Sequence, residues 1–276
     1  MKLNKVFKYS NRNQPAYIIA EIAQAHDGSI GFAHSFIDLA SAVGCDAVKF
    51  QVHIASEESS KQDMFRKKFS FLKESRFEYW KRMEFTIQQW FELKKHAEDL
   101  GLEFICSVFS MKAFNIMKKI NLRLWKIASG EVFNDELIKN IAKQNNIMII
   151  SNGMIDDEEI KKKISKINCK IAILHCNSSY PTSLKDVNLF QMVNLKSKFK
   201  HPIGYSDHTG NPYTSITAIA LGAKIIEIHL CFDKLQFGPD TSSSLSPIEF
   251  KKVIEANKTI YLTKGSLVSK KSQNNL

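Results

Sequence analysis

Ile203-Gly204-Tyr205-Ser206-Asp207-His208-Thr209-Gly210 is the stretch that decides the fold, and Glu227-Ile228-His229 repeats its pattern. Each begins as a short apolar run and ends in polar side chains that include a histidine. An α/β barrel builds its metal and phosphate sites from side chains at the C-terminal ends of such strands. A single histidine of this kind is more often a hydrogen-bonded core or loop residue. Two on successive strand ends could share one divalent ion, so the pair predicts a metal site.

The same unit, an apolar run followed by polar residues and a helical pattern, recurs along the chain. The expected strands are 17–22, 47–51, 103–107, 124–127, 147–150, 171–174, 203–205 and 224–228. The expected helices are 32–42, 88–100, 111–119, 136–145, 156–166, one opened by Pro212 and one from Pro247 to Asn257. Roughly eight such units over about 250 residues predict an α/β fold, a closed (β/α)₈ TIM barrel of one domain. A doubly wound open sheet is the fallback, but no Gly-x-Gly-x-x-Gly motif follows the first strand.

The barrel is expected to span residues 1–263, with an irregular connection at 52–84 and a tail at 264–276. The connection is too long for an ordinary loop after a strand, and it carries aromatic residues such as Phe69 and Trp80. Long loops at that end of a barrel often act as lids, and a helical insertion that only packs is the alternative. The tail is polar and basic with little periodicity, which predicts disorder.

The overall composition narrows the class of protein. No apolar stretch approaches the roughly 20 residues that cross a bilayer, and the N-terminus lacks a secretory signal. The 5 cysteines form no Cys-x-x-Cys pair, which favours a reducing compartment and a cytoplasmic protein. The net charge of +11 comes from dispersed lysines, so neither nucleic acid nor a membrane surface is the expected partner. A positive field would instead help to gather a small anionic substrate.

The residues at or just beyond the expected strand ends are chemically useful. Lysine offers a positive charge to phosphate or carboxylate, and serine hydroxyls complete such a shell. Chance would place mostly glycine, asparagine and aspartate at these positions. The set predicts a pocket for a phosphate and a metal: Glu21, Lys49, Gln51, Ser107, Lys126, Ser129, Glu131, Ser151, His175, Ser178, Ser206, His208, Glu227 and His229.

Several residues keep a second interpretation. Lys126 could form a Schiff base as in aldolases, although the histidine pair favours a metal-assisted reaction. Asp207 either orients an imidazole or caps a helix. His175 is interpreted as structural. His26 is either a turn residue or a substrate contact, and Asp240 has a simple turn as its alternative.

Together these motifs resemble the sialic acid synthase family, the nonulosonic acid synthases that condense phosphoenolpyruvate with an N-acylated amino sugar. The matching segments follow the family's order along most of the chain. They are Ala20-Glu21-Ile22, His26-Asp27-Gly28, Asp46-Ala47-Val48-Lys49-Phe50-Gln51, Lys126-Ile127-Ala128-Ser129-Gly130-Glu131, Ser151-Asn152-Gly153-Met154, His175-Cys176, Tyr180-Pro181-Thr182, Gly204-Tyr205-Ser206-Asp207-His208-Thr209, Glu227-Ile228-His229 and Gly238-Pro239-Asp240.

The resemblance implies a (β/α)₈ barrel and a role for each matched residue. His208 and His229 would bind one Mn²⁺ or Mg²⁺. Phosphoenolpyruvate would be held by Lys49, Lys126, Ser129, Ser151, Ser178 and Ser206. The sugar or the attacking water would meet Glu21, Gln51, Glu131, Tyr180 and Asp240. The residues expected to be catalytic are Glu21, Lys49, Lys126 and Glu131.

The chain also departs from the family's pattern. Full-length members carry a small C-terminal antifreeze-like domain that reaches the partner's pocket in the dimer, and this chain is expected to end before it. His229-Leu230-Cys231 stands where His-Phe-Thr is usual. The prediction is therefore metal-dependent condensation of phosphoenolpyruvate with an amino sugar or related aldose, with a homodimer or a separate partner domain. The alternative is a catalytically silent barrel that binds a sugar phosphate or a partner protein.

Overall fold

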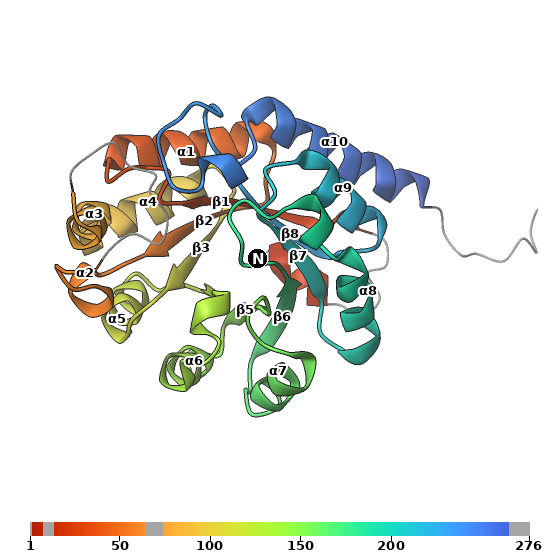
Figure 1. Cartoon of the computed structure of the whole chain (residues 1–276), viewed down its shortest axis with the longest axis horizontal. Coiled ribbons are helices and arrows are strands. Elements are labelled where there is room, and N and C mark those ends of the chain that lie inside the picture. The colour runs from red at the N-terminus through yellow and green to blue at the C-terminus, as the bar shows by residue number, and fades with distance from the viewer. Residues whose placement is uncertain (1, 8–13, 64–73, 265–276) are drawn as a thin grey trace, which may run out of the picture.

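In the computed structural model, eight parallel strands form a closed ring with helices around it (Figure 1). The structure describes residues 2–7, 14–63 and 74–264. Each strand pairs with the next in chain order, and the eighth pairs with the first. The strands are β1 (Tyr17–Ala23), β2 (Ala47–Val52), β3 (Glu103–Val108), β4 (Leu124–Ile127), β5 (Ile147–Ser151), β6 (Lys170–His175), β7 (Ile203–Asp207) and β8 (Ile225–His229). The (β/α)₈ barrel predicted from the sequence is confirmed.

Helices of the described residues cover the outside of this ring (Figure 1). They are α1 (Ile30–Val43), α2 (Ala55–Glu58), α3 (Arg76–Met83), α4 (Ile87–Asp99), α5 (Met111–Lys119), α6 (Asp135–Ala142), α7 (Asp157–Ile164), α8 (Leu189–Lys198), α9 (Pro212–Ala220) and α10 (Pro247–Thr263). Short 3₁₀ turns occur at η1 (Lys2–Phe7), η2 (Ser129–Glu131), η3 (Leu184–Asp186) and η4 (Thr241–Ser243).

No helix is predicted from the sequence between the sixth and seventh strands, where the structure has α8. It starts after Asn188, which has φ 47° and makes no side-chain cap hydrogen bond. Its buried residues are Met192 and Leu195, while Phe190 is 80% exposed. Asn188 is a common N-cap residue type, and Leu189, Met192 and Val193 have helical spacing, so a helix signal is present in the sequence and is weakened by the exposed Phe190.

The inside of the barrel is filled by one apolar layer. Its members, which include Ile19, Ile105 and Ile149, alternate along their strands with residues that face the helices. Leu3 of η1 is fully buried in the same cluster. Its backbone N–H donates to Glu103 Oε2 at 3.0 Å, so η1 is anchored to the beginning of β3.

The strand register sets a polar layer above this apolar one. Glu21 pairs with Lys49 across β1 and β2, and with His229 across β1 and β8. Ser107 pairs with Lys126 across β3 and β4. Each of these residues lies two or four positions beyond an inward apolar residue, so period-two alternation turns its side chain inward. The C-terminal end of the barrel is therefore polar.

The connection at 52–84 is partly helical in its described part. It contains α2 and α3, and α3 begins with a capping box in which Ser75 and Glu78 bond each other's backbone N–H groups. Arg82 fixes α3 to the loop after β1 by donating to Asp27 Oδ1 at 2.5 Å. Residues 64–73, with Phe69 in the expected lid, lie outside the described residues, as does the expected tail beyond Lys264. None of the described helices is both long and apolar enough to cross a membrane.

Candidate active site

Two buried lysines lie at the centre of the polar layer. Lys49 and Lys126 are each 3% exposed. Lys49 Nζ pairs with the Glu21 carboxylate and donates to Ser107 Oγ at 3.2 Å. Lys126 Nζ donates to Ser151 Oγ at 2.7 Å. Buried ammonium groups require negative partners, so the carboxylates around them decide whether both stay charged.

Glu227 supplies the negative charge between the two lysines. Its Oε1 lies 3.6 Å from Lys49 Nζ and 3.7 Å from Lys126 Nζ, and it accepts a hydrogen bond from Ser206 Oγ at 2.9 Å. Its Oε2 is buried without a hydrogen-bond partner among the described residues. From the sequence, Glu227 is recognisable as a strand-end residue but has no assigned role. The available signal was its position two residues before His229, which puts both on the same face of β8.

The electrostatics of this cluster single out one proton-exchanging group. Burial raises the pKa of Glu21 to about 7, with Lys49 opposing and Glu227 adding to that shift. Burial would also raise the pKa of Glu227, but Lys126 and Lys49 lower it to about 2. Burial lowers the pKa of Lys126, whereas the neighbouring glutamates outweigh burial and raise the pKa of Lys49. Near neutral pH, Glu21 is therefore the group that can take up or release a proton.

Lys49, Lys126 and the two glutamates around them form what we call the lysine cluster. Two neutral histidines lie beside it. The ring centroids of His208 and His229 are 5.5 Å apart, and burial lowers the pKa of both rings. His208 Nδ1 donates to the carbonyl oxygen of Asn177 at 2.6 Å, because a carbonyl can only accept. Its Nε2 therefore keeps a lone pair, which faces the Tyr180 hydroxyl at 3.0 Å. A neutral imidazole held in one tautomer by a carbonyl is the form that binds a divalent metal.

The described residues provide only part of the coordination shell of a metal ion. Asp240 Oδ2 lies 3.8 Å from His229 Nδ1, and burial raises the pKa of Asp240 to about 6. No three His, Cys, Asp or Glu side chains among the described residues form a metal cluster by themselves. The geometry therefore offers two imidazole ligands, and water or substrate would have to fill the remaining positions.

The loops after β4, β5 and β6 meet at a rim of small polar groups. Ser129 Oγ accepts the Gly153 N–H at 3.2 Å and lies 3.1 Å from Cys176 Sγ. A Cβ on Gly153 would lie 2.7 Å from Ser178 Oγ and 2.9 Å from Ser129 Oγ, so a larger residue there would have to displace these hydroxyls. We call the polar C-terminal end of the barrel the barrel mouth. The predicted residues Ser129, Ser151 and Ser178 therefore lie on one side of it.

Gln51 and Glu131 have different surroundings. Gln51 Nε2 donates to Glu21 Oε1 at 3.4 Å, and its Oε1 lies 3.0 Å from His53 Nε2. The described contact of Glu131 is instead with Asn134, whose Nδ2 donates to it at 3.0 Å. Gln51 thus joins the lysine cluster, whereas Glu131 is half-buried at the rim and burial raises its pKa.

Three residues with open interpretations have structural contacts. Asp207 accepts hydrogen bonds from Thr214 Oγ1 at 2.5 Å and Ser215 Oγ at 2.6 Å, so it ties the end of β7 to α9. His26 is fully buried, and burial lowers its pKa to about 3. His175 Nε2 lies 3.0 Å from the Val187 carbonyl on the outer side of β6. None of these described contacts is with the lysine cluster.

Comparison with known proteins identifies the family. The model of the NeuB family matches residues 36–269. The N,N'-diacetyllegionaminic acid synthase of Campylobacter jejuni is 34% identical over 266 residues, which cover 93% of this chain and 79% of that protein. Human N-acetylneuraminate-9-phosphate synthase is 32% identical over 259 residues, with 91% of this chain and 72% of that protein covered.

A solved structure agrees with these relatives. The N-acetylneuraminic acid (sialic acid) synthetase of Leptospira borgpetersenii, crystallised with citrate, superimposes with a TM-score of 0.82 at 31% identity. The match covers 94% of this chain and 90% of that one. The resemblance to the sialic acid synthases is confirmed, and with it the expectation of a phosphoenolpyruvate-dependent synthase, a transferase. The barrel, the strand-end motifs and these matches together establish that the chain belongs to the NeuB family.

Proposed function

We propose that this enzyme condenses phosphoenolpyruvate with an amino sugar or related aldose, in a metal-dependent reaction that gives a nonulosonic-type 2-keto sugar acid and phosphate. The observation that carries the proposal is the juxtaposition of two buried lysines with two neutral histidines in a NeuB-family barrel. The lysines suit an anionic substrate and the histidines suit a cation, so the two ends of the mouth have complementary chemistry.

Phosphoenolpyruvate carries a phosphate and a carboxylate, and the site offers donors for both. Lys49 and Lys126 would exchange the carboxylates of Glu21 and Glu227 for the anionic groups of the substrate. Ser129, Ser151, Ser178 and Ser206 would complete its shell with hydroxyl donors. The support is that Ser151 and Ser206 already bond the lysine cluster at 2.7 and 2.9 Å. Fixing the substrate from several sides holds its methylene carbon against the aldehyde.

The reaction forms one carbon–carbon bond and breaks one carbon–oxygen bond. The methylene carbon of phosphoenolpyruvate bonds the aldehyde carbon, and the aldehyde oxygen gains a proton. Water adds to the carbon that bears phosphate, which then leaves with its bridging oxygen. Glu21, with a pKa raised to about 7, is suited to take the proton that this water loses. Gln51, Glu131, Tyr180 and Asp240 would position the sugar and the water.

His208 and His229 would hold one Mn²⁺ or Mg²⁺ next to Tyr180. Such an ion would supply Lewis acidity that makes the aldehyde carbon more electrophilic. The Asn177 carbonyl holds the His208 tautomer, so the lone pair on Nε2 is available without rearrangement of the ring. Neutral rings are also required for binding, and burial keeps both neutral near pH 7.

Two further features fit this assignment. All 5 cysteines lie in the described part of the chain and are free thiols, which suits the reducing cytoplasm. The resemblance also predicts a homodimer or a separate partner domain to complete the sugar end of the mouth. Mass measurement of the purified chain in solution would test that assembly.

Phosphate release tests the proposal directly. The enzyme is incubated with phosphoenolpyruvate, Mn²⁺ and a panel of N-acylated amino sugars and plain aldoses, with and without a chelator. We expect release with at least one sugar, abolished by the chelator and lost in His208→Ala. His34→Ala, on the outer helix α1, is the matched control and should retain the rate.

A separate measurement of phosphoenolpyruvate binding shows whether a negative assay reflects lost turnover or lost substrate binding. Binding without release on every sugar would favour the silent barrel. Absence of binding to the metal-loaded wild type would overturn the assignment of both lysines. Release that survives the chelator and His208→Ala would instead refute the metal site while leaving the synthase activity.

A further inference from the structure

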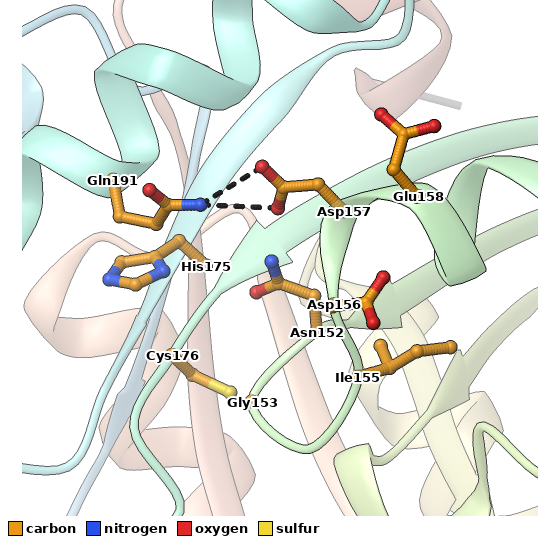
Figure 2. Close-up of a pocket in the computed structure, with 9 residues that line it drawn as sticks. All are labelled: Asn152, Gly153, Ile155, Asp156, Asp157, Glu158, His175, Cys176 and Gln191. Carbon is orange, nitrogen blue, oxygen red and sulfur yellow. Dashed lines mark hydrogen bonds between the residues drawn. The ribbon is translucent and has the colours of Figure 1, made fainter.

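A pocket lies beside the loop after β5 and the end of β6, where the first turns of α7 and α8 also contribute to its lining (Figure 2). We call it the side pocket. Its volume is about 520 Å³, and Asn152, His175, Asp157 and Gln191 are among its lining residues. That volume falls within the roughly 300–1,000 Å³ of small-molecule sites. The side pocket is therefore large enough for a molecule of monosaccharide size.

Alternation along the strands places Asn152 and His175 on the side of the barrel wall away from the lysine cluster, while Gly153 and Cys176 border the rim of the barrel mouth. Ser151 faces inward, where it meets Lys126, so the next residue, Asn152, faces outward. Leu174 belongs to the inner apolar layer, so His175 likewise faces the helices. Asn152 and His175 therefore form the floor of the side pocket, and their side chains point away from the lysine cluster.

Asn152 is an unsatisfied amide at this floor. It is 8% exposed, and its buried Oδ1 has no hydrogen-bond partner among the described residues. A buried polar group without a partner costs free energy, and native proteins rarely leave one in place. Figure 2 shows the amide between His175 and the start of α7, inside the cavity. A ligand that donates a hydrogen bond would satisfy it.

The charges of the side pocket define the ligand further. Its described lining includes the carboxylates of Asp156, Asp157 and Glu158 and contains no lysine or arginine. Lys198 partly neutralises Asp157 from 2.6 Å, and Gln191 Nε2 donates to the same carboxylate at 3.1 Å. Burial lowers the pKa of His175, so this ring adds no positive charge near neutral pH. The side pocket therefore favours a cation and disfavours an anion such as a sugar phosphate.

We infer that the side pocket binds a small hydroxylated amine. The protonated amine would lie near the carboxylates at the start of α7, and a hydroxyl or ammonium proton would be donated to Asn152 Oδ1. The side pocket uses none of the lysines, serines or histidines of the barrel mouth, and it borders the rim of that mouth at Gly153 and Cys176.

Binding of D-glucosamine to the full chain tests the inference, with ligand-observed NMR and calorimetry as readouts. Titration to about 10 mM detects a Kd of about 1 mM or tighter. We expect D-glucosamine to bind at least tenfold more tightly than D-glucose, and glucose 6-phosphate not to bind at the side pocket. Asn152→Leu replaces the amide by an apolar side chain with the same branching and should weaken D-glucosamine binding tenfold or more.

Two further variants test whether D-glucosamine binds in the side pocket or at the barrel mouth. Gln191→Trp, on the α8 wall, should block the side pocket without touching its floor, and it replaces Asn152→Leu if that variant fails to fold. His208→Ala, at the barrel mouth, should leave D-glucosamine binding unchanged. The inference is overturned if the wild type shows no binding, if the pocket variants bind normally, or if His208→Ala alone abolishes binding. Equal affinity for D-glucose would overturn the requirement for a cation.

Discussion

Glu227 is the residue on which the charge balance of the barrel mouth depends. It is buried, and one of its oxygens lies within 4 Å of both ammonium groups, at 3.6 and 3.7 Å. Glu227→Gln would leave Lys49 and Lys126 with less negative charge in a dry environment. Removing one partner of a buried ion pair costs about 3–5 kcal/mol. We expect a loss of that order in the free energy of unfolding, measured by urea titration.

A surface ion pair provides the comparison for this loss. Glu98 pairs with Lys94 at 2.8 Å on α4, and its side chain is 54% exposed. Exposed pairs contribute about 0–1 kcal/mol, so Glu98→Gln should change the free energy of unfolding by less than that. Equal losses in the two variants would show that the mouth is more hydrated than its burial indicates.

Glu21 should leave a signature in the pH dependence of stability. Its pKa is about 7 in the folded state against an ordinary 4.5, so the folded state holds the extra proton between these values. Stability from this group is therefore lost as pH rises through the window, at up to about 1.4 kcal/mol per pH unit. Glu21→Gln lacks the titration. The stability of the wild type relative to Glu21→Gln should fall from pH 4.5 to about 7 and then level off in urea titrations.

At the scale of elements, the contact between β7 and β8 positions the two histidines. A Cβ on Gly204 would lie 2.3 Å from the Ile225 carbonyl oxygen and 2.6 Å from Leu174 Cδ2. Gly204→Ala would force β7 away from β8, and overpacking of this kind costs about 1–3 kcal/mol. We expect that loss in urea unfolding, together with weaker Mn²⁺ binding measured by calorimetry.

Gly31→Ala is the matched control for this substitution. The nearest group to a Cβ there is Ser29 Oγ at 3.7 Å, an ordinary contact in the first turn of α1. This variant should retain both stability and Mn²⁺ binding. If Gly204→Ala behaves in the same way, the barrel wall can relax at this point without moving the strand ends.

Sequence periodicity was sufficient to predict the strands and helices in which apolar residues recur regularly on one buried face. The strands before Glu21, Lys126 and His229 could be predicted because apolar runs end abruptly in polar residues there. The helix α8 was missed although Asn188 and the spacing of Leu189 and Met192 are a helix signal. In this ten-residue helix the exposed Phe190 blurs the apolar period, so the signal is weaker than that of a strand that ends abruptly in polar residues.

The sequence was enough to predict which residues lie in the site, but it did not predict the contacts between their side chains. Strand-end position was enough to select Lys49 and Lys126, because parallel strands bring their C-terminal ends together. It could not show that Glu227 lies between them, which depends on side-chain geometry. Nor could it show that Asp207 bonds α9 rather than His208, because both interpretations fit the same sequence.

For the whole molecule, buried neutral histidines predict sensitivity to acid. Burial lowers the pKa of His26, His53 and His175 below the ordinary 6.5, and that of His26 to about 3. The unfolded chain takes up these protons below pH 6.5 while the folded chain does not. Stability from these residues is therefore complete above 6.5 and is lost as pH falls.

Urea midpoints at neutral and acidic pH measure this loss. We expect the midpoint to fall steadily below pH 6.5, with uptake of several protons on unfolding. His26→Gln should reduce the slope by one proton, or about 1.4 kcal/mol per pH unit. A midpoint that stays constant down to pH 5 would mean that compensating groups dominate the acid response.

The segment 151–153 forms part of two chambers at once. Ser151 bonds Lys126 inside the barrel, Asn152 faces the side pocket, and the Gly153 N–H bonds Ser129 at the rim. Because these three residues are consecutive, an occupant that displaced the segment in one site would displace it in the other as well. Thermodynamic linkage makes such an effect reciprocal, with the same factor in both directions. A metabolite that never meets the reacting carbon atoms could in this way set how firmly the anionic substrate is held.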